Sequence, residues 1–266
     1  MPDFLDALAR DAKATIKAGY YEHLTEAITE PVSLKSAVQI SHNTPVIAEI
    51  KGASPSAGVI RQDFSAGKVA SAMVKGGALG ISVLTEPKHF DGSLANLVKV
   101  RGAVELPVLM KDIIVSPRQL EAAERTGAKA VLLIQALFDR GCGELGVHEM
   151  IEAAHSRKLE VLLEAHDEAE FQRALSSDAD LVGINNRNLA TLEVDLNVTR
   201  RILEKKPEGS LIVVSESGIH SATDILFLRK CGAKAFLVGS AIMSAENVEE
   251  KVREFVSALG SETLER

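Results

Sequence analysis

Five charged residues lie within or directly after short runs of Val, Ile and Leu: Glu49, Lys51, Lys111, Glu164 and Glu216. Such runs predict strands buried on both faces, where an unpaired charge is costly. Carboxylates and amines brought together can donate and remove protons, so these residues predict general acid–base chemistry. An ion-pair network that closes one end of the fold is the structural alternative.

A second set of residues predicts a phosphate site near the end of the chain. Ser217-Gly218 and Gly239-Ser240 each follow an apolar run, and a short helical stretch, 241–244, follows the second pair. Glycine lets the backbone approach an anion closely, and the first N–H groups of a helix can donate to its oxygens. Simple turn glycines are the alternative interpretation.

The elements that must position these residues are eight apolar runs that alternate with helical segments. This alternation predicts βα units and a parallel sheet. The expected strands are 46–51, 80–85, 108–111, 130–135, 160–164, 181–185, 211–215 and 235–238, and the expected helices include 3–18, 65–75, 117–125, 168–175 and 221–230.

An internal repeat favours a closed barrel over an open sheet. Gly77-Ala78, Gly127-Ala128, Asp178-Ala179 and Gly232-Ala233 each precede an even-numbered strand, at intervals of about 50 residues. A two-strand module repeated four times predicts a (β/α)8 TIM barrel, in which alternate strands contribute equivalent layers. We expect one barrel domain over 1–266, with residues 1–44 as an N-terminal helical extension.

Composition excludes several classes of protein. The chain has 30 Lys and Arg against 37 Asp and Glu, a net charge of -7, so we expect no nucleic-acid partner. No apolar run is long enough to span a membrane, and the first residues lack the apolar core of a signal peptide. Cys142 and Cys231 form no CxxC pair. We expect a cytoplasmic monomer.

Seven ordered motifs resemble those of the indole-3-glycerol phosphate synthase family. They cover about residues 45–245 and are Ile47-Ala48-Glu49-Ile50-Lys51, Ala53-Ser54-Pro55-Ser56, Ser82-Val83-Leu84-Thr85-Glu86, Leu109-Met110-Lys111-Asp112, Gly183-Ile184-Asn185-Asn186-Arg187, Ser215-Glu216-Ser217-Gly218-Ile219 and Val238-Gly239-Ser240. The resemblance implies a reaction of tryptophan biosynthesis: closure of the indole ring of 1-(o-carboxyphenylamino)-1-deoxyribulose 5-phosphate, with loss of carbon dioxide and water.

The resemblance also implies a role for each matching residue. Lys111 corresponds to the general acid and Glu164 to the acid–base group of the later proton transfers. Lys51 corresponds to the lysine that holds the substrate carboxylate, and Glu49 and Asn185 to positioning groups. The implied substrate-binding residues are Ser54, Phe90, Arg187, Glu216 and Ser217, and the implied phosphate contacts are Ser54, Gly218, Gly239 and Ser240. The implied chemistry needs no redox cofactor, and we expect no metal.

The chain departs from the family pattern at three positions, and two other functions are open. Gly52 and Ala57 stand where many relatives have basic residues, and Ile113 stands where Phe is common. A Schiff-base aldolase would use Lys111 as its nucleophile. A non-catalytic module that binds a phosphorylated ligand is the other alternative. The run from Gly141 to Gly146 matches GxGxxG but does not directly follow an expected strand, so it does not predict a dinucleotide site.

Overall fold

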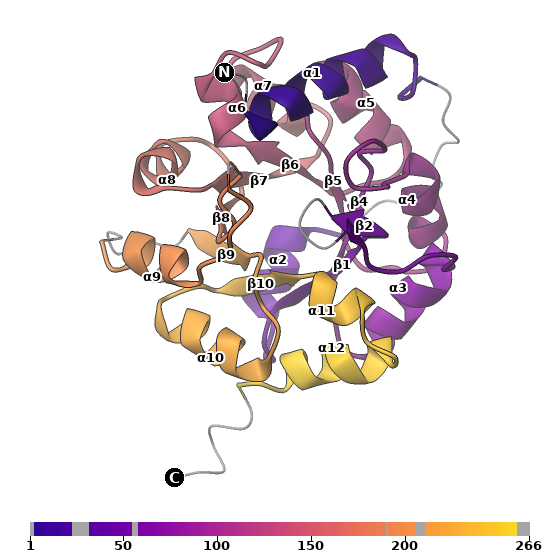
Figure 1. Cartoon of the computed structure of the whole chain (residues 1–266), viewed down its shortest axis with the longest axis vertical. Coiled ribbons are helices and arrows are strands. Elements are labelled where there is room, and N and C mark those ends of the chain that lie inside the picture. The colour runs from indigo at the N-terminus through magenta and orange to yellow at the C-terminus, as the bar shows by residue number, and fades with distance from the viewer. Residues whose placement is uncertain (1–2, 23–31, 55–57, 190, 206–210, 260–266) are drawn as a thin grey trace.

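The computed structural model describes residues 3–22, 32–54, 58–189, 191–205 and 211–259, of which the side chain of Ser54 is not described (Figure 1). Eight parallel strands close into a barrel, in the spatial order β1-β10-β9-β8-β7-β6-β5-β4. Their bounds are β1 Val46–Ile50, β4 Gly80–Leu84, β5 Val108–Lys111, β6 Ala130–Ile134, β7 Glu160–Ala165, β8 Leu181–Asn185, β9 Ile212–Glu216 and β10 Ala235–Val238. A two-stranded hairpin, β2 Ala53–Ser54 with β3 Gly58–Val59, lies in the loop after β1.

Helices surround the barrel, one or more between successive strands (Figure 1). Their bounds are α1 Phe4–Lys17, α2 Leu34–Ile40, α3 Ala66–Lys75, α4 Leu94–Arg101, α5 Pro117–Arg125, α6 Gln135–Asp139, α7 Val147–His155, α8 Glu168–Leu175, α9 Asn197–Leu203, α10 Ala222–Lys230, α11 Ser240–Met243 and α12 Val248–Val256. None of the helices in the described ranges is long and apolar enough to cross a membrane.

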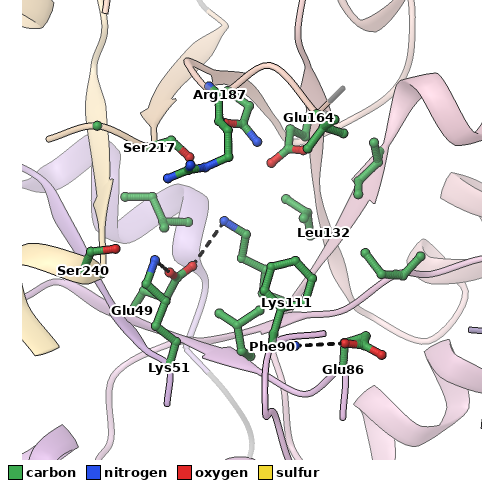
Figure 2. A pocket seen from close by; sticks show the side chains of 18 of the residues that line it. Glu49, Lys51, Glu86, Phe90, Lys111, Leu132, Glu164, Arg187, Ser217 and Ser240 are labelled. Carbon is green, nitrogen blue, oxygen red and sulfur yellow. Dashed lines mark hydrogen bonds and ion pairs between the residues drawn. The ribbon is translucent and has the colours of Figure 1, made fainter. Parts of the chain in front are cut away.

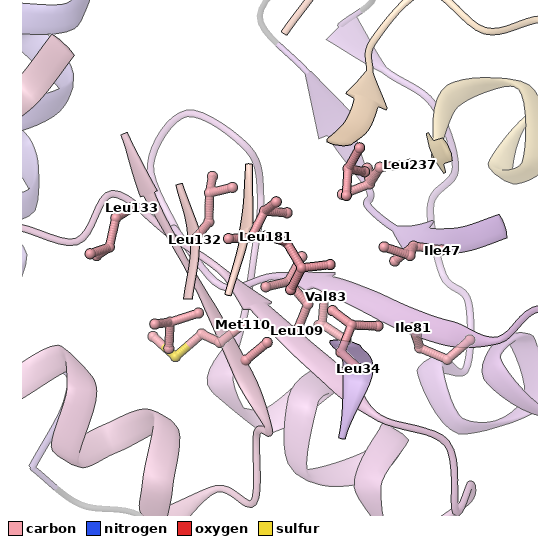
Figure 3. Packing of buried hydrophobic residues seen from close by; sticks show 14 of the residues in the cluster. Leu34, Ile47, Ile81, Val83, Leu109, Met110, Leu132, Leu133, Leu181 and Leu237 are labelled. Carbon is pink, nitrogen blue, oxygen red and sulfur yellow. The ribbon is translucent and has the colours of Figure 1, made fainter. Parts of the chain in front are cut away.

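The hydrophobic core explains why the strands are continuously apolar. Every residue of β1, β4 and β6 is buried, because one face of each strand fills the barrel interior and the other packs against the helices. Figure 3 shows this packing around Leu109, Leu132 and Leu181. Each fully buried Leu of this kind contributes about 1.5–3 kcal/mol relative to leaving it exposed.

The amino end of the barrel is closed by α2. Leu34, at the start of this helix, is fully buried, and a Cβ at Gly80 would lie 2.8 Å from its Cδ1. Glu160, the first residue of β7, accepts hydrogen bonds from the backbone N–H groups of Leu34 (2.8 Å) and Lys35 (3.1 Å) and from the hydroxyl of Ser33. A carboxylate at a helix N-terminus satisfies donors that the helix itself leaves open.

The opposite end of the barrel is bordered by α1. Its N-cap, Asp3, forms a capping box with Asp6. Both carboxylates pair with Arg140 in the loop after α6, at 2.7 and 3.0 Å. Farther along the helix Asp11 pairs with His89, in the loop after β4 (2.9 Å). The helix is therefore tied to loops on two sides of the barrel mouth.

The expected elements agree with the observed ones to within one residue at most ends. Helices 117–125 and 168–175 have the expected bounds. Two differences matter for the site. The seventh barrel strand, β9, ends at Glu216 rather than at Ser215, and α11 begins at Ser240 rather than at Ala241. The GxGxxG segment follows α6 and not a strand.

Candidate active site

A pocket opens at the carboxyl ends of the barrel strands. Most of the expected functional residues line it: Glu49, Lys51, Phe90, Lys111, Glu164, Asn185, Arg187, Ser217, Gly218, Gly239 and Ser240. They come from loops and strand ends far apart in the sequence, and Figure 2 shows several of their side chains, among them Glu49, Lys111 and Glu164, around one central space. The carboxyl end is where barrels of this kind carry their active sites.

Two lysines converge on Glu49 at the centre of the pocket. One carboxylate oxygen of Glu49 lies 2.7 Å from Nζ of Lys51, and the other lies 3.2 Å from Nζ of Lys111 (Figure 2). Burial alone would raise the pKa of Glu49, but the charges of Lys111 and Lys51 outweigh it and lower that pKa to about 2. Glu49 is therefore a carboxylate at neutral pH and positions both lysines.

Lys111 is held between two carboxylates, since Oε2 of Glu216 lies 2.9 Å from its Nζ. Burial acts to lower the pKa of Lys111, but Glu216, Glu49 and Glu164 raise it well above its ordinary value. An ammonium has three N–H donors; Glu216 accepts a hydrogen bond from one of them, and Glu49 faces the ammonium as an ion-pair partner. Lys111 thus keeps a donor for a ligand in the pocket.

Glu216 lies beneath the pocket and is not among the residues that line it, although we expected it to contact substrate. Glu216 is the last residue of β9, and its side chain is completely buried. In the described structure it forms an ion pair with Lys111. Burial raises the pKa of Glu216 to about 7, and the negative charge of Glu164 adds to this, although Lys111 opposes it. The second oxygen, Oε1, has no hydrogen-bond partner among the described residues.

Two glycines make room for these carboxylates. A Cβ at Gly183, on β8, would overlap Oε1 of Glu216, and a Cβ at Gly239 would overlap Oε1 of Glu49. A Cβ added at Gly239 would also lie 2.9 Å from Cε of Lys51. We expected Gly239 only as a phosphate contact, but the absence of its side chain is already required by the ion pair beside it.

Glu164, on β7, has an environment unlike that of Glu216. Oε1 of Glu164 lies 3.2 Å from Nε2 of His166, and Asn185, the last residue of β8, lines the same pocket as Glu164. Burial acts to raise the pKa of Glu164, but His166, Lys111 and Asn185 lower it below its ordinary value. His166 was not among the functional residues expected from the sequence, and its contact with Glu164 is a finding of the structure.

The end of the pocket where we expected phosphate is formed by the loops after β9 and β10. Ser217 and Gly218 both have left-handed backbone, with φ of 65° and 81°. Gly239 is the N-cap of α11, whose first N–H groups have no acceptor within the helix. Ser54 lies in β2, but its side chain is outside the described part of the structure, as is Ala57.

The remaining wall of the pocket is apolar and partly aromatic. Phe90 is held by its backbone N–H, which donates to Glu86 (3.2 Å, Figure 2), and Ile113 lies where relatives often have Phe. Phe4 and Leu8 of α1 also line the pocket. These last two residues were missed by sequence reasoning, because nothing in a helical pattern shows which surface the helix will cover.

A buried network behind the wall links the N-terminal segment to the barrel. Asp112, directly after β5, accepts hydrogen bonds from the hydroxyls of Tyr21 (3.1 Å) and Thr85 (2.5 Å) and from the N–H of Ile113 (2.7 Å). Burial raises the pKa of Asp112 to about 6, and these donors limit the rise. No group of three or more His, Cys, Asp and Glu side chains in the described ranges is arranged to hold a metal ion.

The fold and the site together define a class of protein: a (β/α)8-barrel enzyme whose acid–base groups lie at the carboxyl ends of its strands. Its particular family follows from comparison with known proteins. The family model described as indole-3-glycerol phosphate synthase matches residues 7–255, and the chain belongs to that family.

Individual relatives agree with this assignment. The chain is 39% identical over 224 residues to an indole-3-glycerol phosphate synthase of Campylobacter fetus, covering 84% of this chain and 85% of the relative. It is 40% identical over 263 residues to that of Aromatoleum aromaticum, covering 95% and 98%. A solved thiamine phosphate pyrophosphorylase from Pyrococcus furiosus has a TM-score of 0.60 at 18% identity, covering 86% of this chain and 98% of that one, and shares the fold alone.

Proposed function

We propose that this chain closes the indole ring of 1-(o-carboxyphenylamino)-1-deoxyribulose 5-phosphate and releases carbon dioxide and water. The observation that carries the proposal is the placement of Lys111. Its ammonium lies in the pocket between Glu49 and Glu216, with Glu164 lining the same pocket. A donor held in place by two carboxylates is suited to a reaction in which negative charge develops on an oxygen.

The first step forms a carbon–carbon bond. The aromatic carbon that carries the carboxylate attacks the ketone carbon, and the electron pair of the C=O bond moves onto oxygen. Lys111 donates a proton to that oxygen, which becomes a hydroxyl. Because Glu49 and Glu216 already hold Nζ of Lys111 in the pocket, little reorganisation is needed for this proton transfer.

The second step removes the carboxylate as carbon dioxide, and its bonding electrons return to the ring. Lys51 is placed to hold that carboxylate, since its ammonium is fixed by Glu49 at the edge of the pocket. In the last step an ammonium of the pocket, Lys51 or a reprotonated Lys111, donates a proton to the new hydroxyl, which leaves as water, and a base removes a proton from the adjacent carbon. Glu164, whose pKa is lowered by His166, Lys111 and Asn185 against the effect of burial, is suited to act as that base.

Substrate binding uses the two ends of the pocket. We propose that Gly218, Gly239 and Ser240, with Ser54, contact the phosphate, and that Phe90 and the apolar residues near it contact the aromatic ring. Arg187 and Ser217 line the same pocket, and we propose that they complete the binding surface (Figure 2). Glu216 is buried behind Lys111, so we assign it to the positioning of that lysine rather than to substrate contact.

The aldolase alternative has less support. A Schiff-base lysine must lose its proton to attack a carbonyl, which requires a lowered pKa. The carboxylates around Lys111 raise its pKa instead. Borohydride with a keto substrate should therefore leave Lys111 unmodified.

The decisive experiment is turnover by the purified chain in the presence of EDTA, followed by indole fluorescence. We expect rapid formation of the indole product. Lys111→Met should lower kcat by at least about a hundredfold, the effect of losing one preorganised donor. Lys129→Met is the matched control, because Lys129 donates to a backbone carbonyl on the surface and should retain activity. Absence of turnover by the unmodified chain would refute the proposed function, and full activity of Lys111→Met would remove this lysine from the mechanism.

We also propose that the chain is one barrel domain with residues 1–44 as its extension, and that it acts as a monomer in the cytoplasm without a nucleic-acid partner. Support comes from α1, which contributes Phe4 and Leu8 to the same pocket as the barrel residues, so the site is formed within one chain. Light scattering should give the mass of a single chain, and a dimer mass would contradict this proposal.

A further inference from the structure

His166 is clamped between two carboxylates at the turn that follows β7. Its Nε2 lies 3.2 Å from Oε1 of Glu164, and its Nδ1 lies 3.1 Å from Oε2 of Glu170, which is on α8. The same oxygen of Glu170 accepts the backbone N–H of His166 at 2.8 Å. Glu170 thus fixes both the ring and the main chain of His166, while the other ring nitrogen, Nε2, faces Glu164.

This clamp lies between two different cavities. Glu164 lines the active-site pocket, whereas His166 and Glu170 line a second, polar cavity beside α1. The side chain of His166 is 13% exposed and that of Glu164 is 3% exposed. His166 therefore contacts Glu164 but is not among the residues that line the active-site pocket.

The other charged groups around the second cavity have partners of their own. Arg140 pairs with Asp3 and Asp6, and Arg201 pairs with Asp195. The remaining neighbours are also engaged: Asp167 caps α8, Arg187 donates to the carbonyl of Leu192, and Asp139 of α6 pairs with Arg173. The ion-pair partners of His166 in the described structure are Glu164 and Glu170.

We propose that His166, held as an imidazolium by Glu170, is a positioning residue that keeps Glu164 ionised and aimed into the active-site pocket. This inference rests on the proposed function, in which Glu164 acts as a base. It explains how two buried carboxylates in one barrel differ in role. Glu164 contacts the imidazolium of His166, whereas Glu216 contacts Lys111 and has one oxygen without a hydrogen-bond partner among the described residues.

The electrostatics agree with this arrangement. Burial acts to lower the pKa of His166, but Glu164 and Glu170 raise it to about 10, so the ring is charged at neutral pH. Glu170 acts as the anchor: without it the imidazole would lose both a charge partner and the acceptor that orients its Nδ1–H. A neighbouring opposite charge commonly changes the pKa of a carboxyl by about 1–3 units.

The test is the pH profile of kcat in His166→Gln. Glu164 must be ionised to act, so the acidic limb of the profile reports its pKa. Loss of the imidazolium should move that limb to higher pH by about one unit or more, with KM changed less than about threefold. His166→Lys keeps a cation at this position, so its acidic limb should lie closer to the wild-type pH than that of His166→Gln. The acidic limb of Glu170→Gln should lie at a pH between that of wild type and that of His166→Gln.

His155→Gln is the matched control. His155 pairs with Asp180 at 2.9 Å, a histidine–carboxylate pair on α7 away from both cavities, and its loss should leave the limb unchanged. A double-mutant cycle supplies a further check. In a Glu164→Gln background, adding His166→Gln should cost no further activity, because His166 acts only through Glu164. Additive losses would overturn the inference.

A second measurement needs no catalysis and covers the case in which His166→Gln fails to fold. In wild type, imidazole 15N NMR should show one histidine that stays protonated above pH 8, and the signal should lose this property in Glu170→Gln. A profile unchanged in His166→Gln, or a wild-type chain whose histidines are all neutral at pH 8, refutes the role of His166. Such a result would leave the proposed function unaffected if the wild-type enzyme still turns over the substrate and Glu164→Gln is inactive.

Discussion

At the scale of single residues, the site is built from charges that fix one another. Glu49 forms ion pairs with Lys51 and Lys111, and Lys111 also pairs with Glu216. Buried pairs of this kind contribute little net stability, because desolvation offsets much of their attraction. Their value here is geometric: each ammonium has a fixed position before substrate arrives, so little reorganisation is needed during the reaction.

Lys51 provides the sharpest residue-scale prediction about the substrate. If its ammonium holds the substrate carboxylate, Lys51→Ala should weaken binding of carboxylated ligands by about tenfold or more, which corresponds to at least about 1.4 kcal/mol. A decarboxylated analogue should bind wild type and variant equally. Calorimetric titration with both ligands measures this. Equal weakening for both would mean that Lys51 serves the ion-pair network with Glu49 rather than the carboxylate.

At the scale of elements, short loops and helix ends decide where backbone donors point. The left-handed residues Ser217 and Gly218 turn the chain sharply after β9, and Gly239 begins α11 directly after β10. These two loops are neighbours in the barrel because β9 and β10 are paired. Residues of both loops line the active-site pocket, which supports the proposed anion site there.

The expected phosphate contact can be tested without disturbing the ion pair next to Gly239. Ser240→Asp places a carboxylate at the start of α11, where negative charge favours the helix. The fold should be kept, while KM for the phosphorylated substrate should rise by about tenfold or more through repulsion. Ser240→Asn is the control of equal size without charge. Similar KM values for the two variants would place the phosphate elsewhere.

Two glycines at equivalent helix ends offer a matched test of packing. Gly76 and Gly102 are the C-caps of α3 and α4 and have nearly the same backbone angles. A Cβ at Gly76 would lie 2.6 Å from Cβ of Val252, on α12, whereas at Gly102 the nearest neighbouring atom would be 3.6 Å away.

Alanine at these two positions should therefore have opposite effects. Gly76→Ala should lower the free energy of unfolding by about 1–3 kcal/mol through overpacking. Gly102→Ala should be neutral or raise it by up to about 1 kcal/mol, because it restricts the unfolded chain. Urea unfolding of both variants gives the comparison, and equal effects would show that α12 can move away from α3.

At the scale of the whole molecule, the two ends of the barrel have separate tasks. The carboxyl end carries the charged pocket, whereas the amino end is closed by α2 and by the carboxylate of Glu160 that caps it. Function can therefore vary through the loops at one end while stability is supplied at the other.

Glu160→Ala tests this separation. It removes the acceptor of the N–H groups of Leu34 and Lys35, and the loss of such hydrogen bonds to a charged group should cost about 1.5–3 kcal/mol. We expect a lower Tm by thermal melting and an unchanged kcat/KM at a temperature where the variant is folded. A large loss of activity would show that the amino end is coupled to the active site.

Much of the fold could be predicted from the sequence, because its signals are local. A strand buried on both faces must be apolar along its length, so the runs that became β1, β4 and β6 were recognisable, as was α5 with Pro117 in its first turn. The charges at strand ends were equally visible, since the rest of each run is apolar. Parallel strands bring their carboxyl ends to one edge, and this predicted that Lys111 and Glu164 would share a site.

The sequence alone determined the eightfold alternation, the end of the barrel that carries the chemistry, and the identity of several pocket residues, among them Lys111 and Glu164. Only the tertiary structure decided which surface α1 covers, that His166 contacts Glu164, that Glu216 lies beneath Lys111, and that Gly183 and Gly239 must lack side chains. The physical reason is the range of the interactions. Periodicity and capping act over a few residues, whereas these contacts join residues on different strands, and their geometry exists only once the barrel has closed.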